Sequence, residues 1–100
     1  KADGKPVMID FGADWCIACK ELDKYTYVDA AVRAEAARFV SIKVDATDET
    51  PAMTELQKRF GIVGLPTGVF LPSTENLPKP EPLTGFLKAP EYLEKMKAVR

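Results

Sequence analysis

Cys16 and Cys19 are the only two cysteines of the chain, and two residues separate them. The sequence contains no histidine, which excludes a Cys–His or Ser–His–Asp catalytic arrangement. A closed structural zinc site needs four Cys or His ligands, so a zinc site would have to be shared between two chains. A purely structural disulfide here would contribute only about 2 kcal/mol, because the loop that it closes is so short. The pair therefore favours thiol–disulfide exchange, with shared zinc as the alternative.

The cysteine pair follows a predicted buried strand and begins a predicted helix. The run Val7–Phe11 is short and almost wholly apolar, which is typical of a strand buried on both faces. Helix-forming residues occupy positions 17–25, and Asp14 is placed to cap their start. Free N–H groups and the helix dipole would stabilise a thiolate at Cys16. Cys19, one turn later on the same face, would then resolve a mixed disulfide formed at Cys16.

The remaining elements alternate between helices and strands. Runs rich in β-branched and apolar residues predict strands at 39–44, 69–71 and 83–86. Capping residues and prolines predict where the helices start. Asp29 precedes a helix predicted over 30–38, and Thr50–Pro51 precedes a helix predicted to end at Gly61. Pro90 opens a last predicted helix, which would bury Leu93, Met96 and Val99. Four prolines make 72–82 a connecting loop. The order predicts an α/β fold, with a mixed central sheet flanked by helices on both faces.

Length and composition narrow the class of protein. One hundred residues suit a single domain, and 14 Lys and Arg against 15 Asp and Glu leave no electrostatic footprint for nucleic acid or an anionic membrane. No apolar run approaches the roughly 20 residues that cross a bilayer, so any membrane association would come through a longer parent protein. The polar, abrupt start at residues 1–6 fits a domain excised from such a protein. The even charge favours a monomer, and nothing indicates a metal or an organic cofactor beyond the cysteine pair itself.

The residues around the cysteines resemble a known family. Asp10–Lys20, which reads DFGADWCIACK, is similar to the active-site segment of the thioredoxin superfamily. Within it, ADWCIACKE is most similar to the carboxy-terminal periplasmic domain of DsbD-type thiol:disulfide interchange proteins. The segments Lys24–Thr26, Gly64–Thr67 and Thr84–Phe86 match that domain in the same order, so the resemblance covers nearly the whole chain. It implies a thioredoxin-like fold and a disulfide reductase that works through a redox-active Cys16–Cys19 disulfide.

The resemblance also implies roles for other residues. Pro66 matches the cis-proline that lies against the cysteine pair, where the backbone of Leu65 would pair with a bound partner and Trp15 would contact it. Asp10 matches a buried carboxylate beneath the cysteines, and Asp23 matches an acidic position that faces the pair. The implied relay takes electrons from a membrane-embedded part of the same protein. It passes them, by transient mixed disulfides, to a periplasmic domain that reduces further partners.

Some features depart from the family pattern or carry their own physical consequence. Gly12 stands where an aromatic residue is common, Gly68 stands where a β-branched residue is usual, and the first strand of the fold is missing or very short before Val7. Asp10 interrupts an apolar run, so burial is expected to raise its pKa and suit it to accept a proton from Cys19. Ionised carboxylates nearby would make Cys16 a less acidic thiol than in strongly oxidising relatives.

Each assignment has a plainer alternative. Trp15 could simply cover the core, and Asp10 could only satisfy a hydrogen bond of the backbone or of water. Pro66 could be an ordinary trans proline in a turn, and Asp23 could be a solvent-exposed charge on a helix. For the whole chain, one alternative is a stand-alone thioredoxin-like reductase of the cytoplasm or periplasm, for example in cytochrome maturation. The other is a non-catalytic thioredoxin-fold module that binds peptides beside Pro66.

Overall fold

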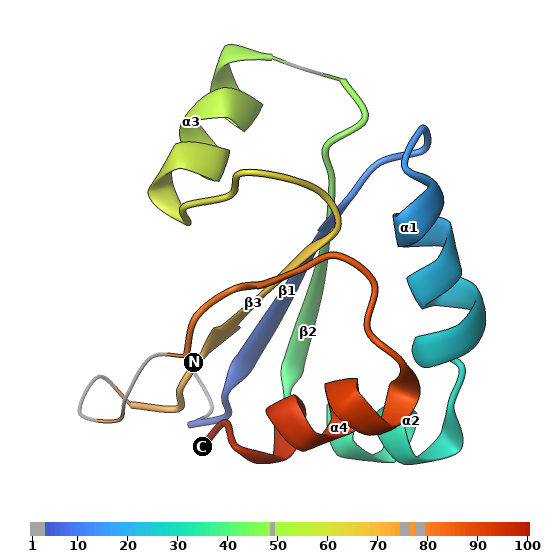
Figure 1. The fold of residues 1–100 in the computed structure, drawn as a ribbon. Helices are drawn as coiled ribbons and strands as arrows, with labels where there is room; N and C mark the ends of the chain where they lie inside the picture. Colours follow the sequence, from blue (N-terminus) through green and yellow to red (C-terminus); the bar gives the residue numbers. More distant parts are fainter. Residues whose placement is uncertain (1–3, 49, 75–76, 78–79) are drawn as a thin grey trace.

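The computed structural model of the chain describes residues 4–48, 50–74, 77 and 80–100. Within these residues a four-stranded sheet has the order β2-β1-β3-β4 (Figure 1). The strands are β1 (Val7–Gly12), β2 (Val40–Asp45), β3 (Thr67–Leu71) and β4 (Leu83–Thr84). The helical elements are α1 (Ile17–Glu21), the π-helical segment η1 (Leu22–Thr26), α2 (Ala30–Ala36), α3 (Pro51–Arg59) and α4 (Ala89–Lys97). This is the mixed α/β fold that the sequence predicts.

Strand β1 is the centre of the sheet and fixes its register. It pairs in parallel with β2, so that Asp10 lies beside Lys43, and antiparallel with β3, so that Asp10 also lies beside Gly68. Strand β4 pairs antiparallel with β3. The parallel pair is joined by a helical crossover through α1, η1 and α2, as expected for a strand–helix–strand unit.

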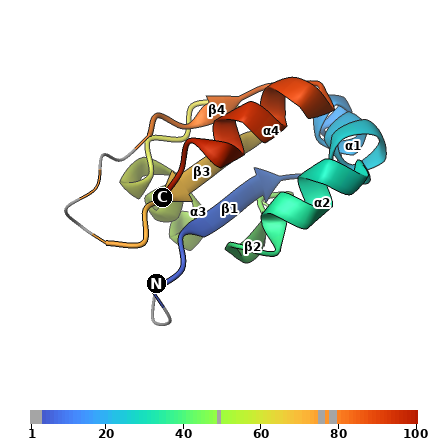
Figure 2. The same cartoon turned by 90° about the horizontal axis from the view of Figure 1, so that it is seen from below.

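Helices cover both faces of the sheet (Figure 2). A hydrophobic core lies between the helices and the sheet on each face. One core lies between the sheet and the η1, α2 and α4 side; its buried residues are Met8, Leu22, Val32, Phe39, Phe70, Tyr92, Met96 and Val99. The other lies on the α3 side; its buried residues are Val7, Ile9, Phe11 and Val69. Because side chains alternate along a strand, Val7, Ile9 and Phe11 point to the second core. Met8 and Asp10 point to the first.

Two of the predicted helix starts are confirmed, and the helix after the cysteines differs. Asp29 caps α2 by accepting hydrogen bonds from the Ala31 and Val32 amides, and Thr50 caps α3 by accepting one from Met53. Gly61, with a φ of +67°, follows the end of α3 as predicted, because glycine adopts this left-handed conformation without strain.

The predicted cap at Asp14 is wrong. Cys16 is the N-cap residue of α1, and its Sγ accepts a hydrogen bond from the Cys19 amide. The predicted continuous helix over 17–25 is α-helical only as far as Glu21. It then widens into the π-helical turn η1, which ends at Thr26.

The other predicted boundaries need smaller corrections. The strand expected at 39–44 runs from Val40 to Asp45, the one expected at 69–71 begins at Thr67, and the one expected at 83–86 ends at Thr84. The helix expected over 30–38 ends at Ala36, and the last helix begins at Ala89. Within this last helix, α4, the buried side chains are Tyr92 and Met96, whereas Leu93 is only partly buried. Positions 75–76 and 78–79 of the predicted proline-rich loop lie outside the described residues.

Candidate functional site

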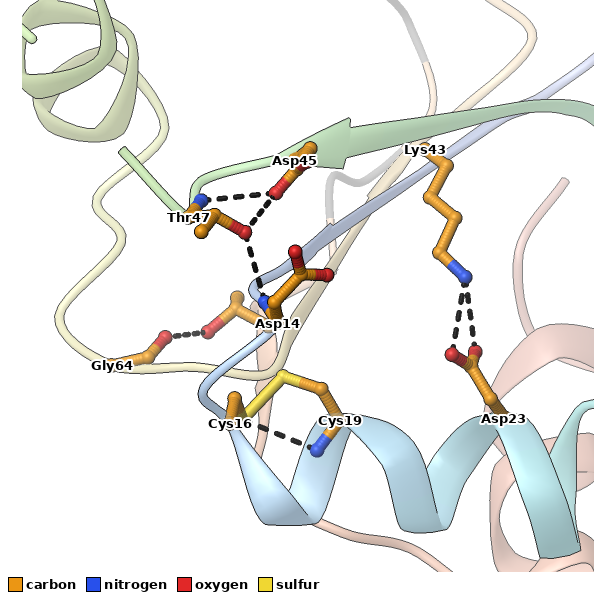
Figure 3. Close-up of a disulfide and its surroundings, with 9 residues drawn as sticks. Asp14, Cys16, Cys19, Asp23, Lys43, Asp45, Thr47 and Gly64 are labelled. Carbon is orange, nitrogen blue, oxygen red and sulfur yellow. Dashed lines mark hydrogen bonds and ion pairs between the residues drawn. A yellow bond between two sulfur atoms is a disulfide. The ribbon is translucent and has the colours of Figure 1, made fainter. Parts of the chain in front are cut away.

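The two cysteines form a disulfide beyond the carboxyl end of β1 (Figure 3). Their Cα atoms are 5.2 Å apart, and the Sγ of Cys16 accepts a hydrogen bond from the Cys19 amide at 3.2 Å. That N–H is one of the free donors of the first helical turn, so the same contact would stabilise a thiolate at Cys16 after reduction. Both residues are buried, with exposed fractions of 6% for Cys16 and 9% for Cys19. The assignment of Cys16 as the attacking thiol therefore rests on its capping position rather than on exposure.

Thr47, which the sequence did not single out, anchors the loop before the cysteines. Its hydroxyl accepts a hydrogen bond from the Asp14 amide at 2.9 Å, and its carbonyl accepts one from the indole N–H of Trp15 at 3.2 Å. The Thr47 hydroxyl donates to Asp45, at the end of β2 (Figure 3). These contacts fix the loop of Ala13–Trp15 against the end of the neighbouring strand. The sequence signal was weak, since a threonine after a strand has many ordinary uses.

Asp10 lies half-buried on β1 and shares a cavity with Cys19. The cavity has a volume of about 510 Å³; its lining includes Asp10, Gly12, Cys19, Asp23 and Lys43. Burial raises the pKa of Asp10 above its ordinary value, as the sequence predicts. The Lys43 ammonium and hydrogen bonding from Tyr27 work against this rise in the pKa, and the negative charge of Asp23 adds to it. The structure thus places a carboxyl group with a raised pKa in the same cavity as Cys19.

Asp23 lies on η1 and lines the same cavity, where it is paired with Lys43. The Lys43 Nζ lies 3.1 and 3.2 Å from the two carboxylate oxygens of Asp23 (Figure 3). Both side chains are largely exposed, so the ion pair itself contributes little stability. Lys43 was not identified as a site residue from the sequence. The parallel pairing of β1 with β2 places Lys43 directly beside Asp10.

Two of the three residues expected to contact a partner line a second, smaller cavity. Trp15 and Leu65 both line this hollow of about 230 Å³. Trp15 is 62% exposed and the neighbouring Val63 is 92% exposed, which leaves apolar surface open beside the disulfide. The Leu65–Pro66 peptide bond is cis, and Pro66 is buried. Pro66 precedes Thr67, which pairs with Phe11, so this loop lies at the same end of the sheet as the cysteines.

No metal centre emerges from the described part of the chain, where no three His, Cys, Asp or Glu residues gather to bind an ion. Within those same residues, no helix has both the length and the apolar character to cross a membrane.

Comparisons with known proteins agree with this geometry. A family model described as Thioredoxin-like matches residues 1–73, and the chain belongs to that family. A thioredoxin from Thermus thermophilus is 30% identical, with a TM-score of 0.80 over 96% of this chain and 74% of that one. With this fold and a Cys-x-x-Cys disulfide at the end of β1, the domain is a thiol–disulfide oxidoreductase.

A narrower similarity is also present. The crystal structure of the oxidised DsbD C-terminal domain of Neisseria meningitidis is 37% identical and has a TM-score of 0.82, covering 96% of this chain and 81% of that one. The thiol:disulfide interchange protein DsbD of Actinobacillus pleuropneumoniae is 42% identical over 92 residues, and that of Vibrio vulnificus is 42% identical over 95 residues. Each match covers over 90% of this chain but only 16% of the relative, so the chain spans about a sixth of the length of these curated relatives.

Proposed function

We propose that the chain is the terminal reductant domain of a longer DsbD-type protein, and that its Cys16–Cys19 pair relays electrons to a partner disulfide. The observation that carries the proposal is the disulfide itself, capping α1 above a cavity that contains a carboxyl group of raised pKa. The similarity to a DsbD C-terminal domain and to DsbD proteins supports the DsbD-type assignment. The proposed direction of flow, from a membrane-embedded part of the protein to a periplasmic partner, is the one that the family resemblance implies.

In the proposed cycle the domain begins as a dithiol. The Cys16 thiolate attacks one sulfur of the partner disulfide, which forms a Cys16–partner bond and releases the other partner sulfur as a thiolate. Cys19 then loses its proton and attacks the Sγ of Cys16, which re-forms the Cys16–Cys19 disulfide and releases the second partner thiolate. Two electrons pass to the partner, and its two thiolates take up the protons that the domain has lost.

Asp10 is the proposed acceptor of the Cys19 proton. Asp10 lines the same cavity as Cys19. Because burial raises its pKa, the pKa of Asp10 lies nearer to that of the Cys19 thiol than the pKa of an exposed carboxyl group would. Asp23 would act more indirectly, because its negative charge raises the pKa of Asp10 while its ion pair holds Lys43 at the cavity.

Partner proteins would dock on the apolar surface beside the disulfide. Trp15 and Leu65 line one hollow there, and Val63 adds exposed apolar area. The expected occupant is an extended segment that carries the target disulfide, with Leu65 and Pro66 beside its backbone.

A redox equilibrium titration tests the proposed direction. The purified domain is poised in graded dithiol–disulfide buffers, free thiols are trapped by alkylation, and the product is counted by mass. We expect a two-electron midpoint of roughly −270 to −200 mV, the thioredoxin-to-glutaredoxin range. A midpoint near about −120 mV would make the domain an oxidant, and cysteines that never form a disulfide would leave only a peptide-binding module.

Single-cysteine variants test the order of attack. Cys19→Ser should accumulate the mixed disulfide at Cys16, because nothing can resolve it. The matched Cys16→Ser variant should accumulate far less with the same disulfide substrate. Equal trapping by both variants would contradict the assigned roles.

The second candidate is a stand-alone thioredoxin-like reductase, such as one that serves cytochrome maturation. It is favoured by the similarity to the Thermus thermophilus thioredoxin. The full-length gene distinguishes the two, since neighbouring membrane spans would accompany only the DsbD-type protein and its periplasmic location.

A further inference from the structure

Two tyrosines that the proposed cycle does not use meet on the face of the sheet to which Asp10 points. Tyr27, directly after η1, and Tyr92, on α4, bring their hydroxyl oxygens to 3.1 Å from each other. Their rings pack edge to face, with centroids 5.4 Å apart and an interplanar angle of 89°. Tyr92 is only 1% exposed. A hydroxyl so deeply buried requires a hydrogen-bond partner, and Tyr27 supplies it.

The hydrogen bonds of these hydroxyls have a direction when Asp10 is ionised. Tyr27 and Asp10 both line one hollow of about 180 Å³, so the two side chains are neighbours. A carboxylate can only accept, so in a hydrogen bond between them Tyr27 is the donor of its single proton. Tyr27 then has only lone pairs to offer Tyr92, so Tyr92 must be the donor in their contact. Burial raises the pKa of both tyrosines, that of Tyr92 to about 12, so each keeps its proton at neutral pH. The result is a chain from Tyr92 through Tyr27 to Asp10.

Gly68 makes room for the end of this chain. It lies opposite Asp10 on β3, and side chains of such cross-strand pairs point to the same face of a sheet. A Cβ at Gly68 would lie 2.8 Å from the Tyr92 hydroxyl oxygen, well inside van der Waals contact. The Tyr92 hydroxyl therefore occupies the space that a side chain at this strand position would fill. A glycine inside a strand weakens it, and a close approach of this kind explains why one is present.

We propose that Tyr92, Tyr27 and Gly68 are positioning residues that orient the carboxyl group of Asp10 in the cavity of Cys19 and favour its ionised form against the effect of burial. The effect on Cys19 rests on the proposed function, in which Asp10 accepts the thiol proton. The carboxyl group is faced by Lys43 from β2, Asp23 from η1, Tyr27 after η1, Tyr92 from α4 and Cys19 from α1. Lys43 and the tyrosine chain favour the charged form, whereas burial and Asp23 oppose it.

A carboxyl-carbon NMR titration of Asp10 tests the positioning role directly. Tyr27→Phe removes the donor but keeps the ring, so we expect the pKa of Asp10 to rise. Tyr92→Phe should raise it by a smaller amount, because it only weakens Tyr27 as a donor. Tyr25→Phe is the matched control, since Tyr25 is 57% exposed on η1, and it should leave the titration unchanged. Asp10 titrating identically in Tyr27→Phe, Tyr92→Phe and the wild type would overturn the inference.

A two-phase kinetic assay links the positioning role to Cys19. The reduced domain reacts with dithiobis-nitrobenzoate, an aromatic disulfide that releases one coloured thiolate when Cys16 attacks and a second when Cys19 resolves the mixed disulfide. On the acid side of its pH profile, Tyr27→Phe should slow the second phase about tenfold, the loss expected for a hydrogen bond to a charged group. Tyr92→Phe should slow it about twofold. The first phase, which reports Cys16, should not change.

Asp10→Asn in the same assay separates the inference from the proposed function. A normal second phase in Asp10→Asn would reject Asp10 as the proton acceptor, while the NMR titration would still decide whether the tyrosines position it. A slow second phase in Asp10→Asn would support Asp10 as the proton acceptor. If, in addition, both tyrosine variants showed normal kinetic phases and an unchanged Asp10 titration, only the positioning role of the tyrosines would be overturned.

Gly68→Ala tests the space beside Tyr92. In the wild type it should destabilise the fold and raise the pKa of Asp10, because the new methyl group displaces the Tyr92 hydroxyl. In the Tyr92→Phe background the same change should be neutral or stabilising, since the other atoms near this Cβ lie at 3.8 Å or more. Equal effects in both backgrounds would contradict the assigned role of Gly68.

Discussion

At the scale of single residues, Asp10 is held between opposing influences. Burial and the nearby charge of Asp23 disfavour its carboxylate, whereas the Lys43 ammonium and the Tyr27 hydroxyl favour it. Burial is the largest of these effects, so the pKa is raised overall. A group balanced in this way responds to small changes in its neighbours, which suits it to exchange protons during a reaction.

The first prediction concerns Asp10 and stability. Because its pKa is raised above the ordinary value of 3.8, the folded protein binds this proton more tightly than the unfolded chain does. Stability is therefore lost as pH rises from the ordinary pKa through the raised one. Asp10→Asn escapes that loss, so its Tm should exceed that of the wild type by a few degrees at about pH 7 and equal it at about pH 3. A lower Tm for Asp10→Asn at neutral pH would show that the charged contacts outweigh the burial.

The second prediction concerns the ion pair beside Asp10. Lys43→Gln removes a positive charge that lowers the pKa of Asp10, so the pKa of Asp10 should rise. Asp23→Asn removes a negative charge that raises the pKa of Asp10, so the pKa of Asp10 should fall. Neither change should alter the free energy of unfolding by more than about 1 kcal/mol, because the pair is largely exposed. Carboxyl NMR titration and urea unfolding measure the two quantities. Shifts of the Asp10 pKa in the same direction would contradict this electrostatic account.

The sequence points to candidate residues that carry their own signal, but it does not assign a role to residues that act only through strand pairing, such as Lys43, or Gly68, which it marks only as a departure from the family pattern. Cys16 and Cys19 stand out by spacing, and Asp10 stands out because it interrupts an apolar run. Lys43 and Gly68 become neighbours of Asp10 only through the strand register, which no local pattern fixes. The roles given to Asp23, Trp15, Leu65 and Pro66 remain predictions. Asp23 lines the cavity of Cys19, Trp15 and Leu65 line the smaller hollow, and Pro66 lies at the same end of the sheet as the cysteines.

At the scale of elements, the type and order of the helices and strands were predictable, and their boundaries were less so. Capping residues and proline marked the starts of α2 and α3 correctly, because these signals act within one helical turn. The widening into η1 was not predictable from local propensity. There the buried Thr26 hydroxyl donates to the carbonyl of Leu87 at 2.5 Å, a contact that joins η1 to the segment before α4.

The third prediction concerns the link between the end of β2 and the active-site loop. Thr47→Ala removes the hydroxyl that accepts the hydrogen bond of the Asp14 amide, so the free energy of unfolding should fall by about 1 kcal/mol. The same change removes the hydrogen bond from the Thr47 hydroxyl to Asp45, which lowers the pKa of that carboxyl group, so the pKa of Asp45 should rise toward its ordinary value. Thr47→Ser keeps the hydroxyl and should behave as the wild type. Urea unfolding followed by Trp15, the single tryptophan, measures the change. A similar loss in Thr47→Ser would point to the methyl group instead.

At the scale of the whole molecule, the site lies at the end of a sheet that has a hydrophobic core on each face. Strand β1 contributes side chains to both cores. It leads through a short loop to α1, whose first turn carries the two cysteines (Figure 1). The framework that positions Asp10, Lys43 and Gly68 is therefore built from strand pairing and packed helices. None of it depends on the bond between the two sulfur atoms.

The fourth prediction follows from this independence. An electron relay must remain folded in both redox states, and the four-residue loop closed by Cys16 and Cys19 restricts the unfolded chain only slightly. Reduction should therefore lower the free energy of unfolding by no more than about 2 kcal/mol. Urea unfolding with and without a dithiol reductant measures the difference, and a Cys16→Ser, Cys19→Ser double variant, insensitive to reductant, is the control. If the reduced domain unfolded without denaturant, the disulfide would be a structural staple, and a relay that cycles through the dithiol would be ruled out.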